Sequence, residues 1–119
     1  MLRGWLAVVP SLALLALAPA CASPTLPLPP PLAPTISAGA DANHFKLSAP
    51  CGAAEGGFVI VVENTDAAIA NDQRVSGSFS SACGAWDATV YATRGDVLNI
   101  TQSDGIDVSQ PAVVQIPLR

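Results

Sequence analysis

The sequence has few charged residues and few of the side chains that carry out chemistry. Only 12% of its 119 residues are charged, and it has a single histidine, whereas roughly a quarter of the residues in a soluble domain are charged. The formal net charge of -4 argues against a nucleic-acid partner, because phosphate binding needs clustered Lys and Arg. One histidine and three cysteines leave most metal sites and catalytic triads incomplete. We therefore expect a protein that is not an enzyme and needs no cofactor.

The hydrophobic residues, half of the total, are concentrated at the amino terminus. Arg3 precedes an apolar run over residues 5–18, and small residues follow the run. This order is typical of a secretory signal peptide. The run is shorter than the roughly 20 residues that cross a bilayer, and Pro10 interrupts it. We predict a signal peptide over residues 1–20 and export of the protein.

The residues before Cys21 resemble the lipobox of bacterial lipoproteins. They read Leu-Ala-Pro-Ala over residues 17–20. The resemblance implies that Cys21 is lipidated and becomes the first residue of the mature chain, held in the cell envelope at an outer or cell-surface membrane. The alternative is ordinary signal-peptidase cleavage after residue 20 or 22, which would release a soluble secreted protein with the same domain.

The cysteine count favours lipidation. Three cysteines in an exported chain leave one unpaired, and a free thiol is a liability in an oxidising compartment. If Cys21 carries lipid, Cys51 and Cys83 remain as a pair. We predict a disulfide between them, which would stabilise so small a domain by roughly 3 to 4 kcal/mol.

A proline-rich stretch separates the signal peptide from the rest. Six of the eleven residues over 24–34 are proline, which fixes the backbone in an extended form of about 3.1 Å per residue. We assign residues 21–38 to a tether that lifts a folded domain, residues 39–119, away from the membrane.

The folded part has the pattern of an all-β domain. Short segments rich in Val, Ile, Thr and aromatics alternate with Gly, Asn, Asp and Ser, and no helical periodicity is present. Residues 58–62 are apolar throughout, so we expect a central strand buried on both faces. Residues 67–74 are expected to form an edge strand and a loop, and Phe79 to belong to the core. We predict one antiparallel β-sandwich of about seven strands.

Several segments resemble bacterial immunoglobulin-like and carboxypeptidase-regulatory-like (transthyretin-like) modules. They are VSGSF at 75–79, VYATRGDVLNI at 90–100 and SQPAVVQIP at 109–117, together with FVIVVEN at 58–64. The resemblance implies an immunoglobulin-like or transthyretin-like sandwich with a structural or adhesive role. Its partner would be a protein or a polysaccharide.

Four features are candidates for binding. Tyr91 should lie on the face opposite Trp86, exposed and able to stack on a sugar. Acidic turn residues, Asp66 with Asp72 and Asp104 with Asp107, could supply oxygen ligands to Ca²⁺, although the dense spacing of a calcium loop is absent.

The remaining two features are a tripeptide and the lone histidine. Arg94-Gly95-Asp96 is an integrin-type motif in a turn that would hold Gly and Asp in any case. His44 is expected at the surface, and a hydrolase would need it to meet Ser and Asp side chains in a pocket.

Overall fold

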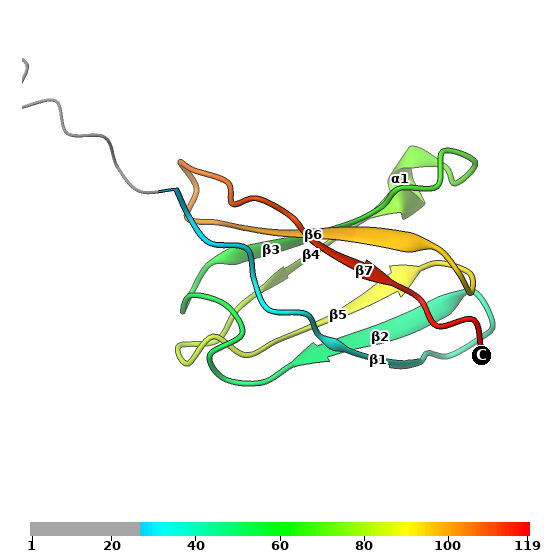
Figure 1. Ribbon diagram of the computed structural model, residues 1–119, viewed down its shortest axis with the longest axis horizontal. Coiled ribbons are helices and arrows are strands. Elements are labelled where there is room, and N and C mark those ends of the chain that lie inside the picture. Colours follow the sequence, from blue (N-terminus) through cyan, green and yellow to red (C-terminus); the bar gives the residue numbers. More distant parts are fainter. Residues whose placement is uncertain (1–26) are drawn as a thin grey trace, which may run out of the picture.

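The computed structural model describes residues 27–119, so Cys21 and the predicted signal peptide lie outside the described residues. Seven strands form two antiparallel sheets that pack face to face (Figure 1). The three-stranded sheet has the order β1 (Thr35–Ala38), β2 (His44–Ala49), β5 (Trp86–Tyr91). The four-stranded sheet has the order β4 (Val75–Phe79), β3 (Val59–Asn64), β6 (Val97–Ser103), β7 (Ala112–Gln115). The prediction of an all-β, two-layered antiparallel fold is confirmed.

The core lies between the sheets and is built by alternation along each strand. Every second residue of β2, β5, β3 and β6 is buried, while the residues between them face outward. The fully buried aliphatic side chains come from both sheets and the final segment: Leu47, Ile60, Val62, Leu98, Ile100 and Ile116. Trp86, the first residue of β5, is 2% exposed and belongs to the same core.

Strand β3 is central in its sheet, but its outer face is not covered. Ile60 and Val62 are buried against the opposite sheet, whereas Val59 and Val61 are half-buried on the outside. The expectation of burial on both faces was wrong, because each sheet of a two-layered sandwich has only one covered face.

The segment before β4 also differs from expectation. Residues 67–74 hold no strand; they form a loop and the short helix α1 (Asn71–Arg74). The Arg74 guanidinium closes this loop by donating hydrogen bonds to the carbonyl oxygens of Ala67 at 3.2 Å and Ile69 at 2.9 Å. The edge of the sheet is supplied by β4 instead.

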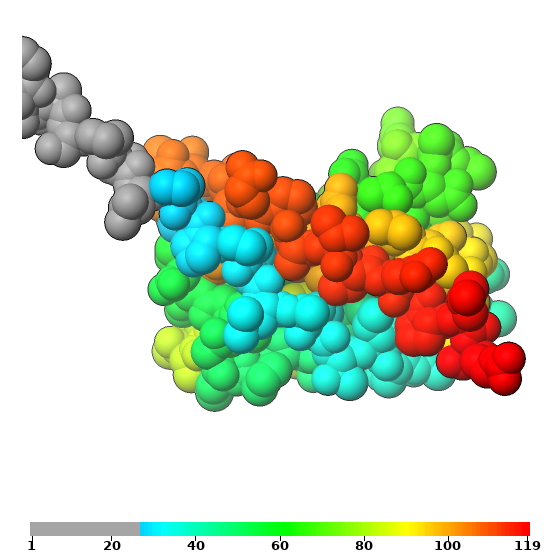
Figure 2. Space-filling view, viewed as in Figure 1, coloured from blue at the N-terminus to red at the C-terminus, as the bar shows by residue number. Residues whose placement is uncertain are grey.

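Part of the range assigned to the tether belongs to the domain. β1 pairs with β2, and Pro31 is buried. The Leu32 amide donates to the carbonyl oxygen of Ala53 at 2.8 Å, and Gln102 Nε2 donates to the carbonyl oxygen of Pro29 at 2.8 Å. Figure 2 shows this segment, in cyan, lying against the green and orange segments. The compact structure therefore begins near residue 29, before the expected boundary at residue 39.

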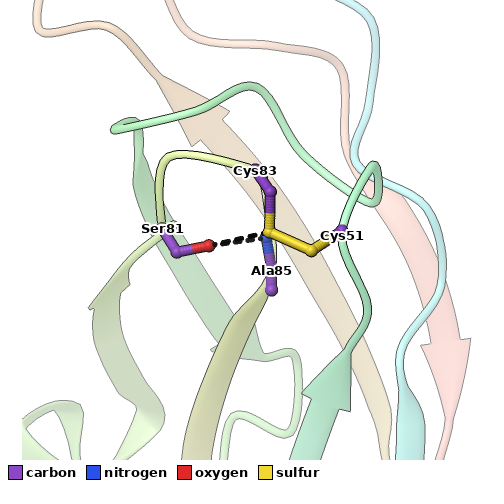
Figure 3. The surroundings of a disulfide bond; sticks show 4 residues. All are labelled: Cys51, Ser81, Cys83 and Ala85. Atoms are coloured by element: carbon purple, nitrogen blue, oxygen red, sulfur yellow. Dashed lines mark hydrogen bonds between the residues drawn. A yellow bond between two sulfur atoms is a disulfide. The ribbon is translucent and has the colours of Figure 1, made fainter.

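A disulfide joins Cys51 and Cys83, with Cα atoms 4.9 Å apart (Figure 3). Cys51 follows β2 and Cys83 precedes β5, so the bond joins two neighbouring strands of one sheet. The Gly52 amide donates to the Cys83 carbonyl oxygen at 2.7 Å. Gly84 has a φ of 88°, and a Cβ there would collide with the carbonyl oxygen of Ala54. The two loops are thus held together by a covalent bond and close backbone contact.

Candidate functional site

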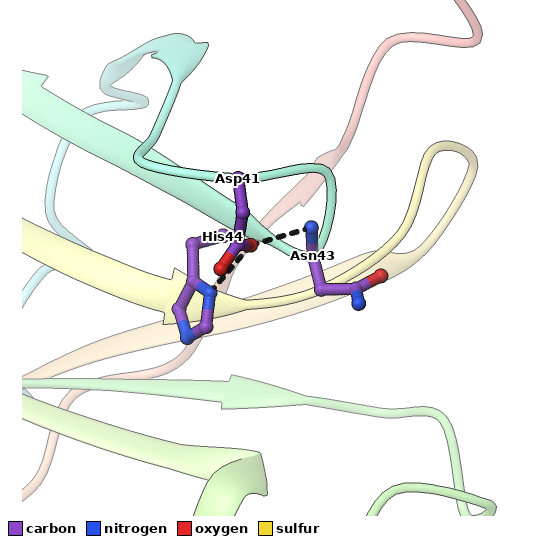
Figure 4. Close-up of polar contacts among 3 residues, drawn as sticks. All are labelled: Asp41, Asn43 and His44. Carbon is purple, nitrogen blue, oxygen red and sulfur yellow. Dashed lines mark hydrogen bonds and ion pairs between the residues drawn. The ribbon is translucent and has the colours of Figure 1, made fainter.

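The residue predicted to bind sugar lies beside the lone histidine. Tyr91 pairs with His44 across β5 and β2, and their rings meet edge to face at 5.4 Å between centroids. His44 Nδ1 lies 2.7 Å from Asp41 Oδ1, which also accepts a 2.8 Å hydrogen bond from the Asn43 amide (Figure 4). The structure therefore gathers Asp41, Asn43, His44 and Tyr91 into one polar cluster on the outside of the three-stranded sheet.

This polar cluster stands on an open surface. The side chains of His44 and Asp41 are 39% and 59% exposed. The hydrogen bond from His44, together with that from the Asn43 amide, holds the pKa of the Asp41 carboxyl below its usual value. A general base needs a nucleophile and a substrate held within hydrogen-bond reach, usually in a cleft. Asp41 and His44 instead stand open to solvent.

The integrin-type tripeptide uses its carboxylate within the fold. Asp96 Oδ2 accepts hydrogen bonds from Asn64 Nδ2 and from the Thr93 amide, both at 2.9 Å. Burial alone would raise the pKa of Asp96, but these bonds and one from the Thr93 hydroxyl outweigh it and lower the pKa. Arg94 lies over the Phe45 ring, 5.5 Å from its centroid. Both charged side chains therefore stabilise the turn, where Gly95 has a φ of 94°.

Two of the acidic turn residues, Asp66 and Asp104, accept hydrogen bonds from backbone amides. Asp104 Oδ1 accepts hydrogen bonds from the Ile106 and Asp107 amides, each at 2.8 Å. These bonds lower the pKa of Asp104. Asp66 Oδ1 accepts from the Ala68 amide at 3.0 Å. Within residues 27–119 no three His, Cys, Asp or Glu side chains come close enough to hold a metal ion.

A pocket of about 180 Å³ lies between the amino-terminal segment and the loop after Cys51. Its lining includes Pro29, Leu32, Glu55 and Gln102. Gln102 is 2% exposed, and its amide oxygen accepts from the Glu55 amide at 2.8 Å while its amide nitrogen donates to Pro29. Ligand pockets are usually about 300 to 1,000 Å³, so this space is small, and the Gln102 side chain already has partners on both sides.

No protein family, curated protein or solved structure matches this chain. The surface itself must therefore indicate where the protein makes contact. None of the helices described for residues 27–119 has the length and hydrophobicity needed to cross a bilayer.

The largest departure from an ordinary surface is on the outside of the four-stranded sheet. Phe79 is 74% exposed, Val75 49% and Val113 63%, and the outer side chains of β3, Val59 and Val61, are half-buried beside them. We call this surface the outer face. It comprises the outward positions of β4, β3, β6 and β7, together with Val108: residues 75, 77, 79, 59, 61, 63, 97, 99, 101, 103, 108, 113 and 115.

Sequence reasoning missed this surface because it placed Phe79 in the core. In β4 the serines are the residues that turn inward, and the Ser78 hydroxyl donates to the carbonyl oxygen of Asp87 on β5 at 2.6 Å. Gly77 shares the face of Phe79 and would fill a core poorly. In a strand that alternates serine with Val, Gly and Phe, neither face is strongly hydrophobic. Gly77 was the one signal in the sequence that the face it shares with Phe79 points outward.

Proposed function

We propose that this chain is an exported, non-catalytic module of the bacterial cell envelope that makes a structural or adhesive contact through its outer face. The observation that carries the proposal is the exposure of Phe79 among valines on a nearly uncharged sheet surface. Contiguous exposed apolar surface marks interaction sites in folded proteins. Among the positions of the outer face, Glu63 is the one charged residue.

We further propose that the sandwich is of the immunoglobulin-like type. Its first, second and fifth strands share one sheet, and its third, sixth and seventh share the other. Constant-type immunoglobulin domains distribute these six strands in the same way, but they place the fourth strand beside the fifth. Here β4 pairs with β3 instead, as the C′ strand of variable-type domains joins the sheet of the third strand. The disulfide differs, because it joins neighbours within one sheet, whereas the antibody bond links the two sheets.

The anchor in this proposal is a lipid on Cys21. It is supported by the lipobox-like residues before Cys21 and by the bond between Cys51 and Cys83, which leaves Cys21 without a disulfide partner in its own chain. Mass spectrometry of the membrane fraction tests it. We expect an acylated peptide that begins at Cys21. An unmodified peptide that begins at Ser23 would contradict the anchor.

The contact surface is tested by site-specific photocrosslinking in cells that export the full chain. A photoreactive residue replaces Phe79 on the outer face in one strain and Lys46 on the outside of the other sheet in a second strain. We expect covalent adducts mainly from position 79. Adducts mainly from position 46 would mean that the opposite surface makes the contact.

A second candidate function is carbohydrate binding at the polar cluster, favoured by Tyr91 standing beside His44, Asp41 and Asn43. Tyrosine presents an apolar ring face together with a polar hydroxyl, which suits contact with a ligand that has both kinds of surface. Retention on insoluble polysaccharides should then fall for Tyr91→Ala and remain for Phe79→Ser. Equal retention of both variants would exclude this function.

A further inference from the structure

We propose that the partner of the outer face is a second copy of this chain, paired face to face about a two-fold axis. This inference rests on the proposed function, whose contact surface it uses. It follows from the shape of β4, from the register of the sheet and from the position of the single charge.

The outer face carries a projection and a hollow side by side. Phe79 projects from the end of β4 with 74% of its surface exposed. Gly77, two residues earlier, faces the same way, and a Cβ added there would have no neighbour nearer than the Ile60 carbonyl oxygen at 4.0 Å. The space above Gly77 is therefore open. A ring and a space of this kind on one strand can complement each other only between two molecules.

The register extends this complementarity across the sheet. Phe79 pairs with Val59, Val59 with Ser103, and Ser103 with Val108, so these four residues form one row. The next row begins at Gly77 and continues through Val61 and Thr101.

A two-fold axis that lies between the facing sheets, perpendicular to the strands and level with Ser78, superimposes the two rows. It sets Phe79 of each copy over Gly77 of the other, and Val59 over Val61. Sheets that pack face to face lie about 10 Å apart with interdigitating side chains. The ring of one copy then fills the space above the glycine of the other, as a self-complementary interface requires.

The charges on the molecule leave this surface free for self-association. The described residues include nine Asp and Glu and four Lys and Arg, so two copies repel each other over most of their surface. Glu63 lies in the row of Val75, three residues from the axis. At about 3.3 Å per residue, the two Glu63 side chains of the pair stand about 20 Å apart along the strands. That distance exceeds the screening length of about 8 Å at physiological salt.

The contact is small. The two overlapping rows cover about 10 Å along the strands and about 14 Å across the three strands β4, β3 and β6, far less than the roughly 1,200 Å² that stable complexes bury. We therefore expect weak pairing in dilute solution. Anchoring raises the effective concentration to the millimolar range, where a weak contact of this kind becomes populated.

Sedimentation equilibrium of the full chain, purified after export in density-matched detergent and measured from about 10 μM to 1 mM, tests the proposal. The wild-type average mass should rise toward that of two copies. Phe79→Ser removes the ring and should weaken association at least tenfold. Gly77→Val adds apolar surface and suits a strand, yet it fills the hollow and should weaken association by a similar factor.

The matched control is Ile106→Ser, which removes an 88% exposed apolar side chain outside the outer face and should leave association within twofold. Urea unfolding of each variant checks that the fold is intact. A wild-type chain that stays monomeric at 1 mM overturns the inference. So does a Gly77→Val chain that associates as the wild type does, or an equal loss for Ile106→Ser, since either shows unspecific hydrophobic adhesion. If the chain is monomeric while position 79 crosslinks to another protein in cells, the proposed function stands and the self-pairing fails.

Discussion

At the scale of single residues, Asn64 is a buried polar side chain whose hydrogen bonds help to join the two sheets. It is 1% exposed, and its Nδ2 donates to the Tyr91 carbonyl oxygen at 3.1 Å and to Asp96 Oδ2 at 2.9 Å. Its Oδ1 accepts from the Asp66 amide at 2.9 Å. Asn64 thus connects β3 of one sheet to the β5–β6 turn that follows the other sheet, and these bonds hold Tyr91 in place.

Replacing Asn64 should therefore be costly. Asn64→Ala removes three hydrogen bonds made by a buried side chain and leaves the Asp66 amide and one oxygen of Asp96 with fewer partners. An unsatisfied group costs about 1 to 3 kcal/mol when it is shielded from water. We expect a loss of roughly 2 to 3 kcal/mol in the free energy of unfolding, measured in urea with the disulfide intact. Asn99→Ala, on the outer face, serves as the control and should change it by less than about 0.5 kcal/mol. Equal effects of the two variants would contradict a structural role for Asn64.

The acidic residues predict how stability responds to pH. Hydrogen bonds lower the pKa of Asp96 in the folded state, despite burial, so the folded protein binds fewer protons there than the unfolded chain. Its contribution is present above the unfolded pKa, near 3.8, and is lost as the pH falls through the folded pKa. Urea unfolding between about pH 6 and pH 2 should show declining stability, with a shallower decline for Asp96→Asn. Parallel curves for the two proteins would show that Asp96 contributes no such linkage.

At the scale of elements, the disulfide holds the loop after β2 to the loop before β5. The hydrogen bonds beside it, from Gly52 to the Cys83 carbonyl and from Ala54 to the Gly84 carbonyl, form only while these loops stay together. The loop after β2 also carries Ala53, whose carbonyl oxygen accepts a hydrogen bond from the Leu32 amide. The disulfide therefore helps to hold the amino-terminal segment against the domain, in addition to the β2–β5 pair.

Removing the disulfide should lower stability without unfolding the sheets. For the double variant Cys51→Ala, Cys83→Ala we expect a loss of about 3 to 4 kcal/mol in the free energy of unfolding, from the entropy that the unfolded chain regains. Wild-type protein treated with reductant should behave in the same way, which controls for the substitutions. A loss below about 1 kcal/mol would mean that the loops are held by other contacts.

The Gln102 side chain also holds the amino-terminal segment against the domain, by hydrogen bonds. Gln102→Leu keeps the volume but removes the hydrogen bonds to Pro29 and Glu55. We expect the Leu32 amide, which bonds to Ala53, to exchange with solvent at least tenfold faster, while amides in β5 keep their protection. Hydrogen exchange read by NMR measures both. Unchanged exchange at Leu32 would show that the segment is seated without Gln102.

Alternation alone was enough to predict two of the elements that line the core, β2 and β5. Residues 44–48 and 86–91 alternate polar and apolar side chains, and the structure buries the apolar set of each. β4 could not be oriented in this way, because its serines find partners such as the Asp87 carbonyl that lie far away in sequence. The seating of residues 29–32 depends on Gln102, 73 residues after Pro29, and no local pattern reveals such a contact.

The candidate sites also divide into features that the local sequence predicts and features that depend on strand pairing. Gly95 and Asp96 were correctly assigned to a turn, since their chemistry is local. Tyr91 was placed at the surface, but its neighbours His44 and Asp41 follow from strand pairing and could not be named beforehand. The outer face is a property of four strands in register, so it became visible only in the folded structure.

At the scale of the whole molecule, the two sheets present different surfaces. The outside of the three-stranded sheet is polar and carries Lys46, Asp87 and the His44–Tyr91 pair. The outside of the four-stranded sheet has Glu63 as its one charged residue, and it carries exposed valines and the Phe79 ring beside the hollow at Gly77. A tethered domain with these two surfaces would keep one hydrated and use the other for contact with its neighbour.

An NMR dilution series of the isotopically labelled full chain tests this assignment of the contact surface most directly. As the concentration rises toward about 1 mM, we expect amide shifts to move at residues 77–79, 59–61 and 101–103, and to stay constant at residues 44–48 in β2. Movement centred on β2 and β5, or the absence of any concentration-dependent shift on the outer face, would contradict it.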